Sequence, residues 1–165
     1  MIPNLNAPDL SSPDLTSESL PLVEPVSAAR FVVSVLGWSQ GLGFSELAGF
    51  NSAVDSTEYS YNGRLGNVRT KQFGRPSPPS ITLKRGLDSI GFAQLFAWHT
   101  LARTNNPAGK VPAAFTILAA SGLPVAACTL ENAWCARLEI DPAQAGGSNV
   151  VMMKVTIECD DIIML

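Results

Sequence analysis

The sequence is poor in charged side chains and nearly lacks histidine. Charged residues make up 15% of its 165 residues, and the single histidine is His99. The three cysteines, Cys128, Cys135 and Cys159, show no C-x-x-C spacing, and with one histidine they match a zinc site poorly. We therefore predict no metal and no cofactor, and we expect the cysteines to be small buried side chains.

Long apolar runs are also missing. No stretch of about 18 apolar residues occurs, so we predict no membrane-spanning helix. The first 25 residues have neither the basic region nor the apolar core of a signal peptide. The length predicts one domain of ordinary size, shorter than an α/β-hydrolase usually needs. A surface with so few charges suggests a subunit that buries area in an assembly.

Charges of one sign are missing from two segments. Residues 1–29 contain no base and four acids: Asp9, Asp14, Glu18 and Glu24. The segment from Tyr59 to Leu87 contains no acid and six bases: Arg64, Arg69, Lys71, Arg75, Lys84 and Arg85. Three interpretations of the basic segment are open: nucleic-acid binding, a solvated loop, or a surface that faces an acidic neighbour in an oligomer. The net charge of −3 disfavours nucleic acid.

The chain divides into an arm and a folded domain. Residues 1–29 are predicted to be an extended N-terminal arm, because prolines interrupt any regular structure there. These prolines are Pro3, Pro8, Pro13, Pro21 and Pro25. Residues 30–165 are predicted to fold as one domain.

The folded part consists of short apolar segments separated by glycine-rich turns. Phe31 to Leu36 is apolar on both faces, which predicts a strand buried on both sides. Further strands are predicted over residues 44–50, 53–60, 80–86, 113–119, 124–130, 133–140 and 149–159. Residues 62–80 are predicted to be a long loop, and Glu131-Asn132 a turn. This pattern predicts a mainly β fold, an antiparallel β-sandwich or barrel with one α-helix.

The one predicted helix runs from Ser89 to Arg103, with Asp88 as its N-cap. Its apolar residues surround most of the circumference, so other elements or another chain must cover most of its sides. The apolar segment from Ile162 to Leu165 would likewise be exposed in a monomer.

Residues 37–41, Gly-Trp-Ser-Gln-Gly, fit the G-x-S-x-G pattern of a serine-hydrolase nucleophile elbow. An acid such as Asp55 and then His99 would complete a triad in the order serine, acid, histidine. However, two glycines follow Ser39 where the elbow needs a helix, and His99 belongs to the apolar helix. We therefore predict a hairpin turn and no catalytic residue, and a hydrolase that uses Ser39 is the alternative.

Four pieces of the sequence occur in one order that is typical of a known family. They are FVVSV (31–35), FSELAGF (44–50), ITLKRG (81–86) and ENAW (131–134). These pieces resemble the tail tube family typified by the T4 phage tube. That family includes the inner tubes of contractile tails and of extracellular contractile injection systems, and it is more distantly similar to the Hcp tubes of type VI secretion. The residues that carry the resemblance are Phe44, Glu46, Gly49, Leu83, Lys84, Arg85, Gly86, Trp98 and Trp134.

The resemblance implies a structural protein and not an enzyme. Hexameric rings would stack into a hollow tube, and contraction of a surrounding sheath would drive the tube through a target envelope to deliver DNA or effector proteins. The implied partners are further copies of the chain, the sheath, the baseplate, the terminator or cap, and the cargo. Assembly in the bacterial cytoplasm, without membrane insertion by this chain, is also implied. A ring that initiates the tube near the baseplate of the same machine is the alternative.

The resemblance also implies where subunits meet. Each subunit would add long strands to a barrel closed across subunits, which removes exposed sheet edges. The expected inter-subunit residues are Trp38, Arg64, Arg69, Lys71, Arg75, Ile163 and Leu165. We expect the acidic arm to pair with the basic segment between subunits. The lumen is expected to be lined by either Thr82 and Lys84 or Lys154 and Thr156.

Overall fold

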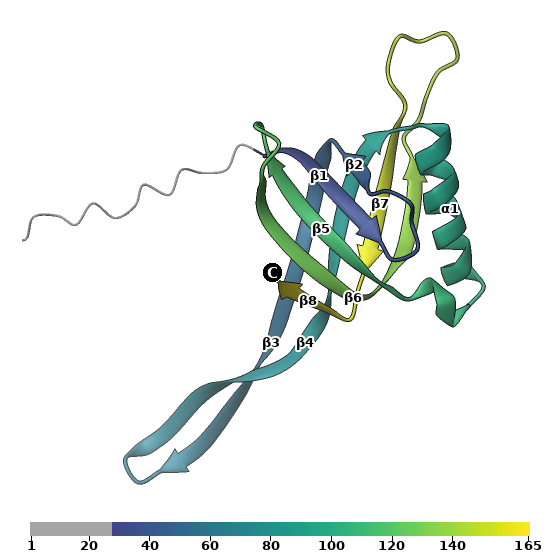
Figure 1. The fold of residues 1–165 in the computed structure, drawn as a ribbon. Helices are drawn as coiled ribbons and strands as arrows, with labels where there is room; N and C mark the ends of the chain where they lie inside the picture. Colours follow the sequence, from purple (N-terminus) through teal and green to yellow (C-terminus); the bar gives the residue numbers. More distant parts are fainter. Residues whose placement is uncertain (1–27) are drawn as a thin grey trace, which may run out of the picture.

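A computed structural model describes residues 28–165 (Figure 1). These residues form eight strands, one α-helix and one 3-10 turn: β1 (Ala28–Val35), β2 (Leu42–Phe44), β3 (Glu46–Gly63), β4 (Gly66–Gly86), α1 (Ser89–Arg103), η1 (Pro107–Gly109), β5 (Val111–Ala119), β6 (Pro124–Ile140), β7 (Met152–Glu158) and β8 (Asp161–Met164). Most of the predicted arm, residues 1–27, lies outside the described residues. The last two residues of that prediction already belong to β1.

The strands form one antiparallel sheet that folds over itself at β6 into two layers. The first layer contains β2, β1, β5 and the N-terminal half of β6, which also pairs with β8. The second layer contains the C-terminal half of β6, then β7, β4 and β3. Both layers contribute to one apolar core, in which Val33, Leu83, Leu130 and Val155 are fully buried. The prediction of a mainly β sandwich with one helix is confirmed.

The prediction of a loop over residues 62–80 is wrong, because this segment belongs to a long hairpin of β3 and β4. The two strands turn at Gly63 to Gly66, where Gly66 has a φ of +133° that favours glycine. Prolines usually oppose a strand, but Pro76 lies where β3 and β4 change register, on a ribbon outside the sandwich. An edge ribbon tolerates the missing N–H of proline, and this explains the error.

The strands predicted over residues 44–50 and 53–60 are also divided differently. Only Leu42–Phe44 forms the hairpin with β1, in which Phe44 stands opposite Phe31. Ser45 then turns the chain into the second layer, where its N–H donates to the backbone oxygen of Lys84 (3.0 Å). From there β3 is continuous, with register shifts between Leu47 and Gly49 and between Asn51 and Ala53. The two predicted strands were divided at the second of these shifts, where a bulge changes which residues face the core.

Glu131-Asn132 is not a turn, and the two strands predicted around it form one strand, β6. Asn132 has a φ of +49°, a left-handed conformation that asparagine adopts more readily than most residues. Its side-chain Nδ2 also donates to Oδ2 of Asp160 (2.9 Å). The chain therefore bends at Asn132 without reversing, and it passes from the first layer to the second.

Replacing Asn132 tests this bend. We expect Asn132→Ala to lower the free energy of unfolding by about 1–2 kcal/mol, because alanine is strained at positive φ and loses the hydrogen bond to Asp160. Asn132→Gly, which removes the same hydrogen bond but relieves the backbone, should be less harmful. Urea unfolding measures both values. Equal stability of Asn132→Ala and the unaltered chain would contradict the assignment.

The helix prediction is confirmed in its bounds and its cap, and the cover expected on most of its sides stays a prediction. Asp88 caps α1, and its Oδ2 accepts from the N–H of Gly91 (3.0 Å). Leu95 and Trp98 face the core and are buried, whereas Ile90 and Phe96 on the outer side are 61% and 45% exposed. Within the described part of the chain, the helix is thus covered on one side only.

Candidate assembly surfaces

The outer face of the second layer carries a regular set of polar side chains. Strand alternation places Leu83 of β4 in the core, so Thr82 and Lys84 point to the outside. In the ladder with β7, Thr82 stands opposite Thr156 and Lys84 opposite Lys154. The Oγ1 atoms of the two threonines lie 3.3 Å apart. The two residue pairs expected as alternative lumen linings therefore lie together on one face.

One row of this face crosses all four strands of the layer. Glu46, Lys84, Lys154 and Glu139 are successive cross-strand neighbours in β3, β4, β7 and β6. Nζ of Lys84 lies 3.8 Å from Oε1 of Glu46, and Nζ of Lys154 lies 3.8 Å from Oε2 of Glu139. The two acids and two bases cancel, so the row is polar without net charge. Sequence reasoning missed this row because it depends on the register of strands far apart in the chain.

The two edges of the second layer differ. Within residues 28–165, β3 pairs with β4 along its length and its other edge has no strand partner. At the opposite edge, α1 packs beside β6 (Figure 1). Nδ1 of His99 in α1 lies 2.9 Å from the backbone oxygen of Cys135 in β6. An edge strand with free N–H and C=O groups is a template for a further strand. The edge of β3 is therefore the side of this layer that is open to a second chain.

The β3–β4 hairpin extends far beyond the sandwich (Figure 1). Beyond Asn51 and Ser80, its two strands pair only with each other within the described residues. Its large apolar side chains are exposed, and Leu65 and Phe73 have relative exposures of 104% and 99%. An isolated two-stranded ribbon is marginally stable in water. Exposed apolar residues on such a ribbon mark a surface for another protein chain.

The four bases expected to meet other subunits all lie on this hairpin. Arg64 is in the turn, and Arg69, Lys71 and Arg75 are exposed on β4. Nζ of Lys71 lies 3.9 Å from Oε1 of Glu58 on the facing strand. The structure thus gathers these bases on one projecting element, and their contact with a neighbouring subunit stays a prediction.

The other expected contact residues lie elsewhere. Trp38 is half-buried, and its ring meets the ring of Trp98 edge-on, with 5.6 Å between centroids. Ile163 and Leu165, in and after β8, are exposed. Trp38 thus has a packing role inside its own chain, and contacts of all three residues with a neighbour stay predictions.

Most of the residues that carry the family resemblance are placed to stabilise the fold. Phe44, Leu83 and Trp98 are buried in the core. Trp134 is half-buried, and Nζ of Lys110 lies over its ring, 4.6 Å from the centroid. These four residues explain why the resemblance predicts the fold well.

Arg85 and Gly86 join β4 to α1. The guanidinium of Arg85 lies 5.7 Å from the centroid of the Phe44 ring and donates through Nη2 to Oδ1 of Asp88. The same carboxylate caps α1 by accepting from the N–H of Gly91. A Cβ at Gly91 would lie 2.6 Å from Oδ1 of Asp88 and 2.8 Å from Cζ of Arg85. A side chain at this position would therefore force the Arg85–Asp88 pair to shift.

Gly91→Ala should reverse the usual effect of this substitution. Inside a helix, alanine is normally more stable than glycine by about 0.5–1 kcal/mol. Here the new methyl group would displace the Arg85–Asp88 pair, and we expect the free energy of unfolding to fall by about 1–2 kcal/mol. Thermal and urea unfolding measure the change. Asp88→Ala removes the same contact. In a chain that already carries Asp88→Ala, Gly91→Ala should therefore lower the free energy of unfolding by less than it does in the unaltered chain. A gain in stability from Gly91→Ala would refute this explanation.

The surroundings of Ser39 do not form a triad. Ser39 is exposed in the connection between β1 and β2, and the groove beside it is lined by α1 residues such as Gln94 and Leu101. Neither His99 nor any carboxylate lines this groove, and the ring of His99 is hydrogen-bonded to the backbone oxygen of Cys135. No helix follows Ser39, since β2 begins at Leu42. The predicted hairpin turn is confirmed.

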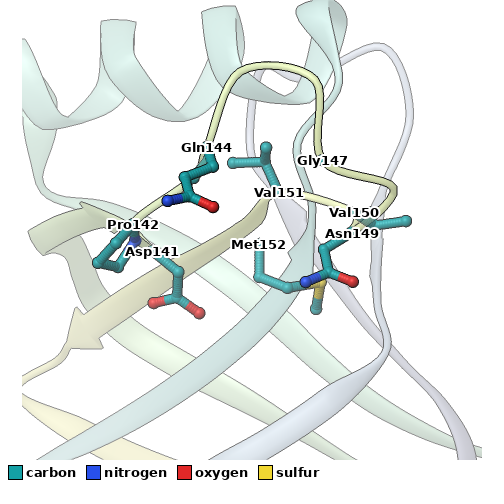
Figure 2. A pocket seen from close by; sticks show the side chains of 9 residues that line it. Asp141, Pro142, Gln144, Gly147, Asn149, Val150, Val151 and Met152 are labelled. Atoms are coloured by element: carbon teal, nitrogen blue, oxygen red, sulfur yellow. The ribbon is translucent and has the colours of Figure 1, made fainter.

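A second groove lies under the loop between β6 and β7 and has a volume of about 560 Å³ (Figure 2). The side chains that line it include Gln144, Asn149 and Met152, and Asp141 is the one charged side chain among them. The backbone N–H of Asp141 donates to the oxygen of Met152 (2.9 Å). A single carboxylate without a base or a metal-ligand partner does not form a catalytic group, so this groove shows no chemistry of its own.

The three cysteines are buried free thiols, as predicted. Burial raises the pKa of Cys135 to about 12 and, as the largest of several causes, that of Cys159 to about 11. Both thiols therefore stay protonated at neutral pH and are poor nucleophiles. Within residues 28–165, no three His, Cys, Asp or Glu side chains are grouped to hold a metal ion. Over the same range, no helix has the length and apolar character needed to cross a membrane.

Comparison with known proteins decides the family. Residues 27–163 match the family described as T4-like virus tail tube protein gp19. The chain belongs to this tail tube family. The match extends from the residue before β1 into β8, so it includes both layers, the hairpin and α1. The resemblance inferred from the sequence is thereby confirmed, and with it the membership of a family of structural tube proteins.

Solved structures from contractile injection systems share the fold. A chain of the sheath-tube complex of the extracellular contractile injection system PVC in the extended state has a TM-score of 0.67 at 23% identity, over 87% of this chain and 93% of that chain. A chain of the PVC sheath/tube terminator has a TM-score of 0.69 at 23% identity, over 87% and 99%. A chain of the anti-feeding prophage cap has a TM-score of 0.69 at 18% identity, over 92% and 98%. No curated protein sequence matches this tail tube protein.

Proposed function

We propose that this tail tube protein is the main subunit of the inner tube of a contractile phage tail or contractile injection system. Copies form a ring in which the open edge of β3 meets a neighbouring copy, and rings stack through the β3–β4 hairpin. The observation that carries the proposal is this hairpin, an exposed ribbon that projects from the sandwich of a tail tube family member. Such a ribbon gains stability only when another chain covers it.

The polar outer face of the second layer is proposed to line the lumen. Its threonines and its neutral row of paired acids and bases stay hydrated, so a cargo meets no apolar patch that would retain it. The side chains on the other face of the same strands form the core. This assignment joins the two alternatives expected from the sequence, since Thr82, Lys84, Lys154 and Thr156 all lie on the lumen face.

The proposed partners follow from the assemblies in which similar chains occur. Chains of this fold are present in a sheath-tube complex, in a tube-terminating cap and in a baseplate whose structure was 6-fold symmetrised. We therefore propose hexameric rings inside a sheath, with a baseplate at one end, a cap at the other and a DNA or effector cargo within. Assembly would take place in the bacterial cytoplasm.

Electron microscopy of the purified full-length chain tests the proposal. We expect stacked rings, or hollow tubes of uniform width, after concentration in negative stain. Single rings that never stack would favour the alternative of an initiator ring near the baseplate. A monodisperse monomer at all concentrations, also in the presence of preformed tube ends, would contradict the proposal.

We also propose that the chain catalyses no reaction, and Ser39→Ala tests the hydrolase alternative. Since no base lines the groove beside Ser39, neither the unaltered chain nor the variant should hydrolyse an activated ester above the buffer rate. The variant should assemble like the unaltered chain, because Ser39 is exposed and buries nothing. Turnover by the unaltered chain that disappears in Ser39→Ala would instead establish the hydrolase.

A further inference from the structure

We propose that the acidic arm, residues 1–27, of one copy binds the basic β3–β4 hairpin of a second copy in the next ring. This inference rests on the proposed stacking of rings. It gives the exposed β3–β4 hairpin a binding partner, and it gives residues 1–27 a role in assembly.

The projecting part of the hairpin is basic. Residues 52–78 contain four bases, Arg64, Arg69, Lys71 and Arg75, and two acids, Asp55 and Glu58, which leaves a net charge of +2. Among ion pairs within residues 28–165, the hairpin bases make one, between Lys71 and Glu58. The other three bases are exposed and have no carboxylate partner in the described part of the chain. The hairpin is thus suited to an acidic ligand.

The arm has the complementary composition. Its 27 residues include four acids and no lysine or arginine, so its side chains carry a charge of −4. It also contains leucines and a valine between the acids, which match the exposed Leu65 and Phe73 on the hairpin. A segment with both features can pair its carboxylates with the hairpin bases and cover the apolar side chains.

The positions of the two elements indicate a contact between copies. The arm joins the sandwich at Ala28, which pairs with Ala119 beside the turn that leads into β6. The hairpin leaves the sandwich at Ser80. Ser80 of β4 and Trp134 of β6 both stand opposite Glu158 of β7, so they lie at the same level of the second layer. The stretch of β6 between these levels spans roughly 30 Å at the usual rise of a strand, and Figure 1 shows the start of β1 and the hairpin at opposite ends. In a head-to-tail stack, the arm end of one copy therefore faces the hairpin end of the next.

Zero-length cross-linking tests the contact. A carbodiimide joins a carboxylate to a lysine amine only when the two are in direct contact, and Lys71 is the one lysine within residues 52–78. An equal mixture of ¹⁵N-labelled and unlabelled full-length chains is assembled, cross-linked and digested for mass spectrometry. We expect peptides that join Lys71 to Asp9, Asp14, Glu18 or Glu24 with one labelled and one unlabelled partner. The Lys71–Glu58 link within one chain is the internal control.

Variants of the hairpin charge test whether the contact with the arm is electrostatic. The triple variant Arg64→Gln, Arg69→Gln, Arg75→Gln keeps the reactive Lys71 but removes three charges, and it should lower the yield of arm links roughly fivefold. The matched variant Asp55→Asn makes the hairpin more basic, keeps the Lys71–Glu58 control link and should raise that yield. Addition of 0.5 M salt should lower the yield of arm links in both variants, because exposed ion pairs are screened.

The outcomes separate this inference from the proposed function. Mixed-isotope arm links that follow these charge effects support the inference. Arm links within single chains only, or no arm links at all, overturn it, whether or not tubes form. Negative-stain images of the same samples decide the proposed function independently: tubes without arm links retain the tube and reject the arm contact.

Discussion

A chain in which residues 54–76 are replaced by a two-residue Asn-Gly turn is expected to fold normally and to form no tubes. Ala53 and Ser77 stand opposite each other in the β3–β4 ladder, so a short turn can close the hairpin there. The removed part contributes no buried residue to the core. The loss of assembly should therefore be nearly complete, with a free energy of unfolding that changes by less than about 1 kcal/mol.

Three measurements on this shortened chain separate assembly from folding. Circular dichroism and thermal unfolding report the fold, and negative stain reports the tubes. A chain shortened by residues 143–147, in the exposed loop between β6 and β7, is the control for a deletion of exposed residues that leaves the hairpin intact. Tubes of normal length from the chain without the hairpin would show that stacking depends on other surfaces.

Trp98→Ala should give the largest loss of stability of any single substitution considered for this protein. The Trp98 side chain is 4% exposed and donates through Nε1 to the backbone oxygen of Gly109 (2.8 Å). Its ring also packs edge-on against the ring of Trp38. Truncation of a buried tryptophan leaves a cavity and typically costs about 3–5 kcal/mol. It also leaves the oxygen of Gly109 without its donor, so the turn after α1 should loosen.

Trp98→Phe is the matched variant, because it keeps an aromatic ring and removes the indole N–H. We expect it to cost about 1–3 kcal/mol, less than Trp98→Ala. Urea unfolding at several protein concentrations measures both, since assembly would otherwise stabilise the folded state. A cost below about 1 kcal/mol for Trp98→Ala would mean that α1 does not depend on this contact for its place in the fold.

Local signals in the sequence predicted the elements that depend on local chemistry. Asp88 before an apolar run predicted the start of α1, and the apolar pattern of residues 149–159 predicted the strand β7. Both features act over a few residues, so a single segment contains enough information. The fold class followed from the number of such strands and from the single helix.

Features that depend on pairing between distant segments could not be predicted. Residues 62–80 look like a loop because of their prolines and glycines, and their extended form depends on pairing with β3. The turn predicted at Asn132 is a bend, because β7 and β8 hold the two halves of β6 in different layers. The charge row from Glu46 to Glu139 likewise exists only through the register of four strands. Assembly residues were named from the family resemblance, and the hairpin that gathers four of them became visible only in the structure.

In the assembly proposed above, copies of this tail tube protein form a ring whose lumen is lined by the outer face of the second layer. A cryo-EM reconstruction of the assembled chain, at a resolution that shows side chains, measures this directly. We expect hexameric rings in which Thr82, Lys84, Lys154 and Thr156 face the lumen, the edge of β3 lies against a neighbouring copy, and the hairpin contacts the next ring. A tube with these four residues on its outer surface, or with the β3 edge and the hairpin free of any neighbour, would contradict it.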